Sequence, residues 1–202
     1  IEEEKMQKAC EVAGKEPIFR ILPYQKKKAG IVTTGSEVYY HRIEDKFTPV
    51  VIEKLKECGV TEVKQIQCND DHEMITEAIR TLIEDGSDLI VCTGGMSVDP
   101  DDRTPLAIKN ACTEVVTYGA PVLPGAMFML AYCEKEGRQI PVMGLPGCVM
   151  YAKRTIFDLV LPRIMCDEKL HEKDFQLLGQ GGLCLSCPVC TFPNCGFGKG
   201  GY

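Results

Sequence analysis

The stretch "LIVCTGGMSVDPDDRTP", residues 89–105, decides the fold of this chain. Its first four residues are apolar without alternation, which is typical of a strand buried on both faces inside a parallel sheet. Two glycines and then three aspartates follow closely. Because ligands of open parallel sheets bind beyond the carboxyl ends of the strands, the stretch predicts an interior strand that leads into a binding loop.

Strand and helix patterns alternate on both sides of this stretch. We expect strands at residues 29–35, 60–68, 88–92, 113–119 and 139–147, and helices at residues 45–59, 71–86, 103–112 and 148–165. The two earlier helices carry apolar faces at helical spacing, formed by Phe47, Val50, Val51, Leu55 and Cys58 and by Met74, Ile75, Ala78, Ile79, Leu82 and Ile83. The alternation predicts a three-layer α/β/α fold with a mostly parallel sheet.

The composition excludes several classes of protein. The formal net charge is −6 and there is no basic block, so we expect no binding to nucleic acid. The apolar runs are broken by Pro and Gly and fall short of the about 20 residues that cross a membrane, so we expect no membrane span. Eight of the twelve cysteines are scattered singly through residues 1–166, which predicts free thiols in a reducing cytoplasm.

We expect three regions along the chain. Residues 1–28 are predicted to form a helix and a linker, the end of a longer upstream region, because neither an initiating Met nor a signal sequence precedes them. Residues 29–166 contain the alternating strands and helices and form the main domain. Residues 167–202 form a C-terminal tail that contains the other four cysteines.

Three loops are predicted at the carboxyl edge of the sheet: "TTGSEV" (33–38), "TGGMSVDPDD" (93–102) and "GLPG" (144–147). Glycine lets backbone N–H groups approach an anion closely, so the loops suit a phosphorylated ligand. The acids at the same edge would repel a phosphate unless a cation such as Mg²⁺ intervened. Asp45, Asp102 and Glu37 are the candidate acids for phosphoryl, nucleotidyl or metal-oxyanion transfer. Alternatively, Asp45 and Asp102 only cap helices.

Four motifs together resemble a known family: "TTGSEV", "RIEDKFTP", "CTGGMSVDPDDRTP" and "VMGLPGCVM". Their order and separation, over roughly residues 29–166, resemble the molybdopterin-binding domain shared by molybdopterin adenylyltransferase, molybdopterin molybdenumtransferase and the gephyrin-type fusions. The resemblance implies a three-layer domain that binds the pterin and its terminal phosphate. It also implies that the domain assembles as a trimer or dimer, as relatives do.

The resemblance assigns roles to individual residues. It makes Asp102 the acid near Mg²⁺ and the reacting phosphate, and Asp45 the second functional acid. The binding residues that it implies are Thr34, Gly35, Ser36 and Glu37 in the first loop, Thr93, Gly94, Gly95 and Ser97 in the second, and Leu145, Pro146 and Gly147 in the third. The sequence departs from the pattern at Ser36, where many relatives have Asp, and at His41, where they often have Gly; we expect His41 to lie in solvent.

The family divides into two activities. In one branch, adenylylated molybdopterin is hydrolysed as molybdate or tungstate is inserted, and "TTGSEV", "GGMSVD", "VLPG" and "GLPG" are closer to that branch. In the other branch, molybdopterin receives an adenylyl group from ATP, and the "DDRTP" run is closer to it. We expect Mg²⁺-dependent insertion; adenylyl transfer, a non-catalytic binding or delivery module, and nucleotide-pyrophosphate hydrolysis are the alternatives.

Four cysteines in the tail have the spacing C-x₂-C-x₂-C-x₄-C: Cys184, Cys187, Cys190 and Cys195, called the tail cysteines below. Thiolates two residues apart can converge on one metal. The spacing resembles the bacterial ferredoxin run, with one extra residue before the last cysteine and Pro193 before it rather than a proline after it. A four-iron cluster, a structural zinc ion and a terminus without metal are the alternatives.

Overall fold

The buried strand β3 (Leu89–Thr93) lies inside a six-stranded sheet of order β2-β1-β3-β6-β5-β4 in the computed structural model, which describes residues 1–17, 19–25 and 27–200. The other strands are β1 (Lys28–Thr34), β2 (Glu62–Cys68), β4 (Glu114–Tyr118), β5 (Met129–Lys135) and β6 (Arg138–Leu145). β1 pairs in parallel with β2 and β3, and β3 with β6, whereas β5 is antiparallel to both of its neighbours. The mostly parallel sheet is therefore confirmed.

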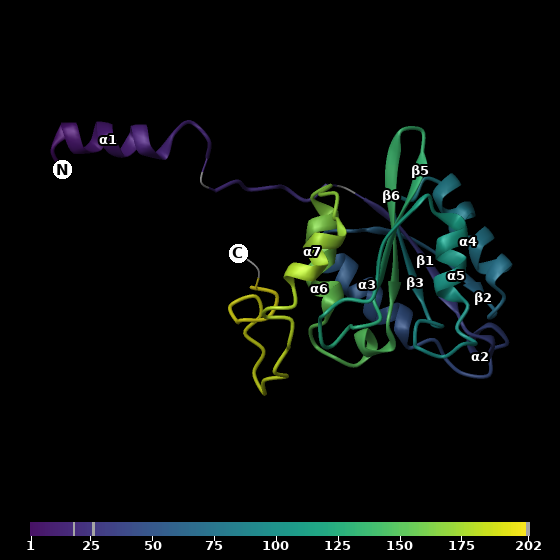
Figure 1. Ribbon diagram of the computed structural model, residues 1–202. Helices are drawn as coiled ribbons and strands as arrows, with labels where there is room; N and C mark the ends of the chain where they lie inside the picture. Colours follow the sequence, from purple (N-terminus) through teal and green to yellow (C-terminus); the bar gives the residue numbers. More distant parts are fainter. Residues whose placement is uncertain (18, 26, 201–202) are drawn as a thin grey trace.

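Helices cover both faces of the sheet (Figure 1). One face packs against α3 (Phe47–Glu57), α6 (Ile156–Met165) and α7 (Glu172–Leu177). The other packs against α4 (His72–Glu84) and α5 (Thr104–Ala111). Two short helices, α2 (Ser36–Tyr39) and the 3₁₀ helix η1 (Gly147–Met150), follow β1 and β6. The predicted three-layer fold is confirmed.

The helix predicted over residues 148–165 is wrong, because the structure breaks it into η1 and α6. Thr155 and Asp158 form a capping box, in which Thr155 Oγ1 accepts from Phe157 N at 3.2 Å and Asp158 Oδ2 accepts from Thr155 N at 2.8 Å. These bonds satisfy amides that a continuous helix would have bonded to preceding carbonyls, so α6 begins at Ile156.

The apolar faces of α3 and α4 are largely as expected, with two differences. Met74 is 37% exposed because the buried face of α4 is centred on Ile75, Ile79 and Leu82. Lys54 of α3, a charged residue, is buried with only 8% of its surface exposed. Its burial requires a partner inside the protein, which α6 supplies.

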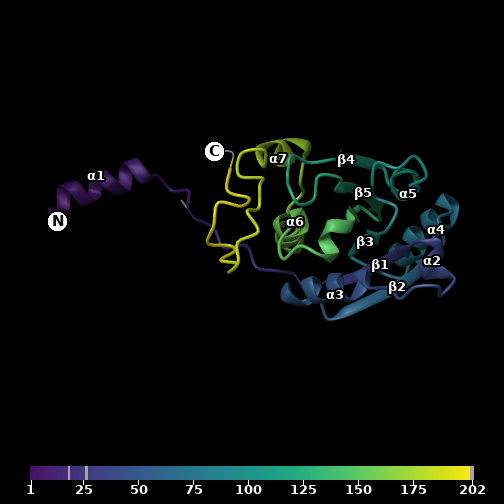
Figure 2. The same ribbon diagram turned by 90° about the horizontal axis from the view of Figure 1, so that it is seen from below.

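The segments before residue 29 and after residue 166 differ in how far they are buried. α1 (Glu3–Ala13) contains no buried residue and lies away from the sheet in Figure 1. By contrast, Leu170, Phe175 and Phe197 are buried in the same core as α3 and α6. The views in Figure 1 and Figure 2 both place the part of the tail that follows α7, up to residue 200, beside α6 and α7. The division at residues 28 and 166 stays a prediction. Among the described residues, no helix has the length and apolar character to span a bilayer.

Candidate functional site

The three predicted loops leave the sheet side by side. β1, β3 and β6 are adjacent parallel strands, and their registers pair Thr33 with Thr93 and Thr93 with Leu145. Their carboxyl ends therefore meet at one edge of the sheet. Leu145 itself is fully buried as the last residue of β6, so the third loop begins with Pro146.

The second loop requires its two glycines. Gly94 has φ of 87°, and a Cβ there would lie 2.3 Å from the carbonyl oxygen of Thr34. Gly95 has φ of 55°, and a Cβ there would lie 2.8 Å from Thr104 Oγ1. Thr104, the first residue of α5, donates to Gly94 O at 2.9 Å and lies 3.2 Å from Thr34 Oγ1. The glycine loop is thus folded tightly against the end of β1.

Asp102 organises the acidic part of that loop. Its Oδ2 accepts from Ser97 N at 2.5 Å, and its own amide donates to Asp99 O at 3.0 Å. Asp99 in turn accepts from Asp101 N at 3.0 Å. α5 begins after Arg103 without a side-chain cap, so Asp102 folds the loop rather than capping the helix. Its second carboxylate oxygen, Oδ1, accepts no hydrogen bond from any residue that the structure describes.

Asp45 reaches the edge from the opposite face of the sheet. Its Oδ1 accepts from Phe47 N and Thr48 N, both at 3.0 Å, so it caps the first turn of α3. Its Oδ2 accepts from Gln65 Nε2 at 3.0 Å and lies 3.4 Å from Thr33 Oγ1. Burial raises the pKa of Asp45, but these hydrogen bonds outweigh it and hold the pKa below its ordinary value. This geometry matches the helix-cap alternative.

The first loop is closed by an acid that sequence reasoning did not identify. Ser36 N donates to Asp70 Oδ2 at 2.8 Å, at the start of the short helix α2. Gly35 has φ of 131° and a Cβ there would meet nothing within 4 Å. Glu37 and His41 are exposed, the latter as expected.

A cavity of about 530 Å³, called the edge cavity below, lies where the second and third loops meet. Its lining residues are Met96, Ser97, Leu123, Pro124, Gly125, Ala126, Met127, Pro146, Gly147, Cys148, Leu183 and Cys184. It brings together three predicted binding residues, Ser97, Pro146 and Gly147, and it has the size of a small-molecule site. The other predicted binding residues do not line it, and neither do the two candidate acids. They are the four residues of the first loop, Thr93, Gly94 and Gly95 of the second, and Leu145.

Near the edge, one polar group was missed, Tyr118, and one predicted binding residue, Thr93, is buried. Tyr118, the last residue of β4, donates its hydroxyl to Ser97 O at 3.3 Å. Its pKa is raised by burial and then by the charge of Asp102. Thr93 is 1% exposed, and its hydroxyl has no hydrogen-bond partner among the described residues. Tyr118 was marked only by lying near the end of a strand-like segment, whereas the family resemblance had already implied Thr93.

The tail cysteines all line one further cavity of about 350 Å³, called the tail cavity below. Cys187 and Cys190 are exposed, whereas Cys184 and Cys195 are half-buried. In residues 1–17, 19–25 and 27–200, no three His, Cys, Asp or Glu side chains are gathered closely enough to hold a metal ion. The four thiols line one cavity without forming a coordination shell, and binding of metal by the tail cysteines stays a prediction.

A loop that begins with two glycines and continues with three aspartates lies at the carboxyl edge of a mostly parallel α/β sheet, which is where α/β domains of this class bind their ligands. Residues 30–165 match the family described as "Probable molybdopterin binding domain". The match covers well over half of the chain, so the chain belongs to this family, and the resemblance of the motifs is confirmed.

Individual relatives are more distant. The chain is 36% identical over 85 residues to a CinA-like protein of Mycobacterium sp. (strain MCS), a stretch that is 42% of this chain but 20% of that protein. It is 35% identical over 95 residues to a CinA-like protein of Mycobacterium avium (strain 104), covering 47% and 22%. The matched part is thus about a fifth of the length of these relatives.

Solved structures agree with the fold. The tungsten cofactor synthesizing protein MoaB from Pyrococcus furiosus aligns with a TM-score of 0.53 and 22% identity, over 62% of this chain and 84% of that one. A molybdopterin biosynthesis protein from Mycobacterium abscessus aligns with a TM-score of 0.55 and 17% identity, over 70% and 92%. At these identities the likeness supports the three-layer fold alone.

Proposed function

We propose that the domain binds molybdopterin at the carboxyl edge of the sheet and catalyses Mg²⁺-dependent metal insertion into its adenylylated form. One observation carries the proposal: the edge cavity is lined by both Leu-Pro-Gly turns, through Leu123, Pro124 and Gly125 and through Pro146 and Gly147. These turns are the motifs that resemble the insertion branch, and Ser97 of the glycine loop lies with them.

The chain's own groups suit the parts of such a ligand. Backbone amides at Gly94 and Gly95 are the donors by which the glycine loop would bind a phosphate. The two glycines allow this loop to pack closely against Thr34 and Thr104. The buried Thr93 hydroxyl beside these glycines is a donor that a ligand oxygen would satisfy. The apolar turns that line the edge cavity offer the flat surface that a pterin ring needs.

Asp102 suits Mg²⁺ better than Asp45 does. One carboxylate oxygen of Asp102 is held by Ser97 N, whereas no described residue donates to the other, and Mg²⁺ binds through one or two carboxylates together with substrate phosphate. When bound, the ion would neutralise negative charge on the reacting phosphate. Asp45 already accepts bonds from α3 and Gln65, so its placement is explained without chemistry, and its catalytic role stays a prediction.

The test is turnover of adenylylated molybdopterin with molybdate or tungstate and Mg²⁺, followed by release of AMP and by metal content. Asp102→Asn should keep the fold and lower the rate by about 10²-fold, the usual scale for losing one electrostatic group. Asp101→Asn is the matched control, because only its backbone amide bonds within the loop. Equal turnover by parent and Asp102→Asn would show that Asp102 only folds the loop.

The alternatives give different products in the same assay. AMP transfer from ATP to molybdopterin indicates the adenylyl-transfer branch, and cleavage of ADP-ribose indicates pyrophosphate hydrolysis. Tight binding of molybdopterin without any product indicates a binding module.

We also propose that the protein is a homo-oligomer, dimer or trimer, in the cytoplasm. Sedimentation at micromolar concentration tests the assembly. The twelve cysteines, all in the described part of the chain, are free thiols, as a reducing compartment requires.

A further inference from the structure

The tail is attached to the domain at both ends of its cysteine segment. At the start, Leu123 N donates to Gly182 O and Cys184 N donates to Leu123 O, both at 2.8 Å, which forms a parallel bridge. At the far end, Phe197 is 4% exposed and packs in the main core. Gly198 N also donates to Gly181 O at 2.9 Å, which closes the segment on itself. The cysteines therefore lie on a loop whose two ends are fixed.

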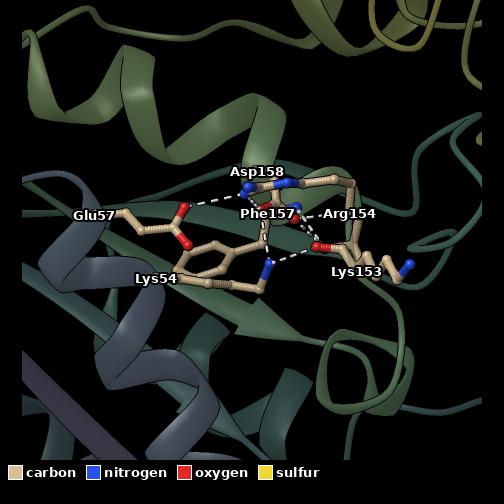
Figure 3. A network of polar contacts seen from close by, with 7 residues as sticks. Lys54, Glu57, Lys153, Arg154, Phe157 and Asp158 are labelled. Atoms are coloured by element: carbon tan, nitrogen blue, oxygen red, sulfur yellow. Dashed lines mark hydrogen bonds and ion pairs between the residues drawn. The ribbon is translucent and has the colours of Figure 1, made fainter. Parts of the chain in front are cut away.

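The surroundings of the tail cavity suit a group with negative charge. Lys153 and Arg154 line it together with the thiols, and Lys153 Nζ donates to Pro188 O at 3.3 Å. Arg154 lies 5.1 Å from the centre of the Phe192 ring and is held from behind by Asp158 and Glu57 (Figure 3). Lys153 is the cation that would face a charged group in the cavity, because Arg154 is already paired with Asp158 and Glu57.

We propose that the tail cysteines bind a four-iron, four-sulfide cluster. Three of them follow one another at two-residue intervals, as in the bacterial ferredoxin run. Zinc sites with four cysteines instead use two pairs separated by a longer stretch of chain, about 15–20 residues. All four thiols surround one cavity, and a cluster places its ligands around a volume rather than around one ion.

Binding requires the loop to close around the cluster. Cys187 and Cys190 are exposed and lie outside helices and strands, so they can move while the two ends of the loop stay attached. Coupling of this kind is usual, because thiolate sites form together with their metal.

The cluster would lie next to the edge cavity. Leu183 and Cys184 line both cavities, so one cluster ligand belongs to the wall of the site that we propose for molybdopterin. This second part rests on the proposed function, whereas binding of the cluster does not.

The experiment is anaerobic reconstitution of the full chain with iron and sulfide. We expect four iron and four sulfide per chain, visible absorbance that dithionite bleaches, and an electron paramagnetic resonance signal after reduction. Cys187→Ser should lose most of the iron, and Cys10→Ser, at a cysteine of α1 that is also exposed, should retain it. Circular dichroism of both variants checks that the fold is unchanged.

Three results would overturn the cluster: one zinc ion per colourless chain, no iron above the level of an unreconstituted sample, or equal iron in the two variants. The position of the cluster is tested separately, by adding molybdopterin to the reduced protein. A changed resonance signal supports the shared wall, and an unchanged signal at saturation overturns it. Because the cluster is assayed without pterin, and pterin binding is assayed on Cys187→Ser, either proposal can fail without the other.

Discussion

Asp158 of α6 is predicted to be the most sensitive charged residue of the domain (Figure 3). Its side chain is 4% exposed and contacts Lys54 Nζ at 2.7 Å and Arg154 Nη1 at 2.8 Å. It also accepts from Thr155 N at 2.8 Å. The carboxylate thus joins α3, the segment before α6 and α6 itself, and it neutralises Lys54, whose side chain is 10% exposed.

The stability that Asp158→Asn should lose follows from the contacts that remain after the substitution. Asparagine can still accept from Thr155 N, but the Lys54 ammonium is left buried without a counter-charge. Removing one partner of a buried pair costs about 3–5 kcal/mol. Lys54→Met should cost less, because Asp158 keeps Arg154 and Thr155. The variant loses the hydrogen bond to the Asp158 carboxylate, about 1.5–3 kcal/mol, and the one to Lys153 O, about 1 kcal/mol, and the buried methionine offsets part of this loss.

Urea unfolding at pH 7 measures the free energies of the parent, both single variants and the double variant. The double variant should lose less stability than the sum of the single losses, with a coupling of about 1–3 kcal/mol, because no unpaired ammonium remains in it. Arg154→Gln is a comparison, since its side chain is 27% exposed and its loss should cost less. A loss below about 1 kcal/mol for Asp158→Asn, or strictly additive losses, would refute the reasoning.

Three further predictions concern the carboxyl edge of the sheet. Gly94→Ala should destabilise the domain by at least about 1–2 kcal/mol, from the positive φ of residue 94 alone, and should abolish ligand binding. Gly147→Ala is the control, because a Cβ at residue 147 meets nothing within 4 Å. It should leave the melting temperature unchanged and weaken binding only if the ligand lies at that residue. Thr93→Val should not lower stability, because the hydroxyl has no described partner, but should weaken molybdopterin binding in calorimetry if the ligand satisfies it. Asp45→Ala should cost about 1 kcal/mol as a lost helix cap. Because the pKa of Asp45 is lowered in the folded protein, the stability that its carboxylate adds is complete above the ordinary pKa of aspartate and declines as the pH falls below it. The unfolding curves of parent and variant should therefore converge in acid. Unchanged turnover by Asp45→Asn would contradict a catalytic role.

The sequence predicted the central strands because their evidence is local. A buried parallel strand is a short apolar run, and Leu89–Thr93 needs no distant partner to be recognised. The hairpin of β5 and β6 was missed, although it too has a local signal. Glu136 and Gly137 form a two-residue turn between these strands, with positive φ at both residues, 52° and 75°. Turns of this type commonly join two antiparallel strands into a hairpin. The capping box at Thr155 and Asp158 is a second local signal that was not used.

The site could be predicted only to the level of its loops. Register along the strands brings the three loops to one edge, and that follows from parallel pairing alone. Which face of the sheet each acid occupies depends on contacts between distant residues. Asp45 is drawn to the α3 face by Thr48 and Gln65, whereas Asp102 is held in its loop by Ser97. No spacing in the sequence indicates that these two acids lie on different faces of the sheet.

The edge cavity also contains residues that the family resemblance does not supply. The family match ends at residue 165, yet Leu183 and Cys184 line the cavity, and backbone hydrogen bonds to Leu123 hold them there. A ligand in this cavity would therefore contact the tail as well as the shared domain. Because the tail contributes a thiol at that wall, the affinity and the electronic state of a bound pterin should depend on whether the tail cysteines carry a metal.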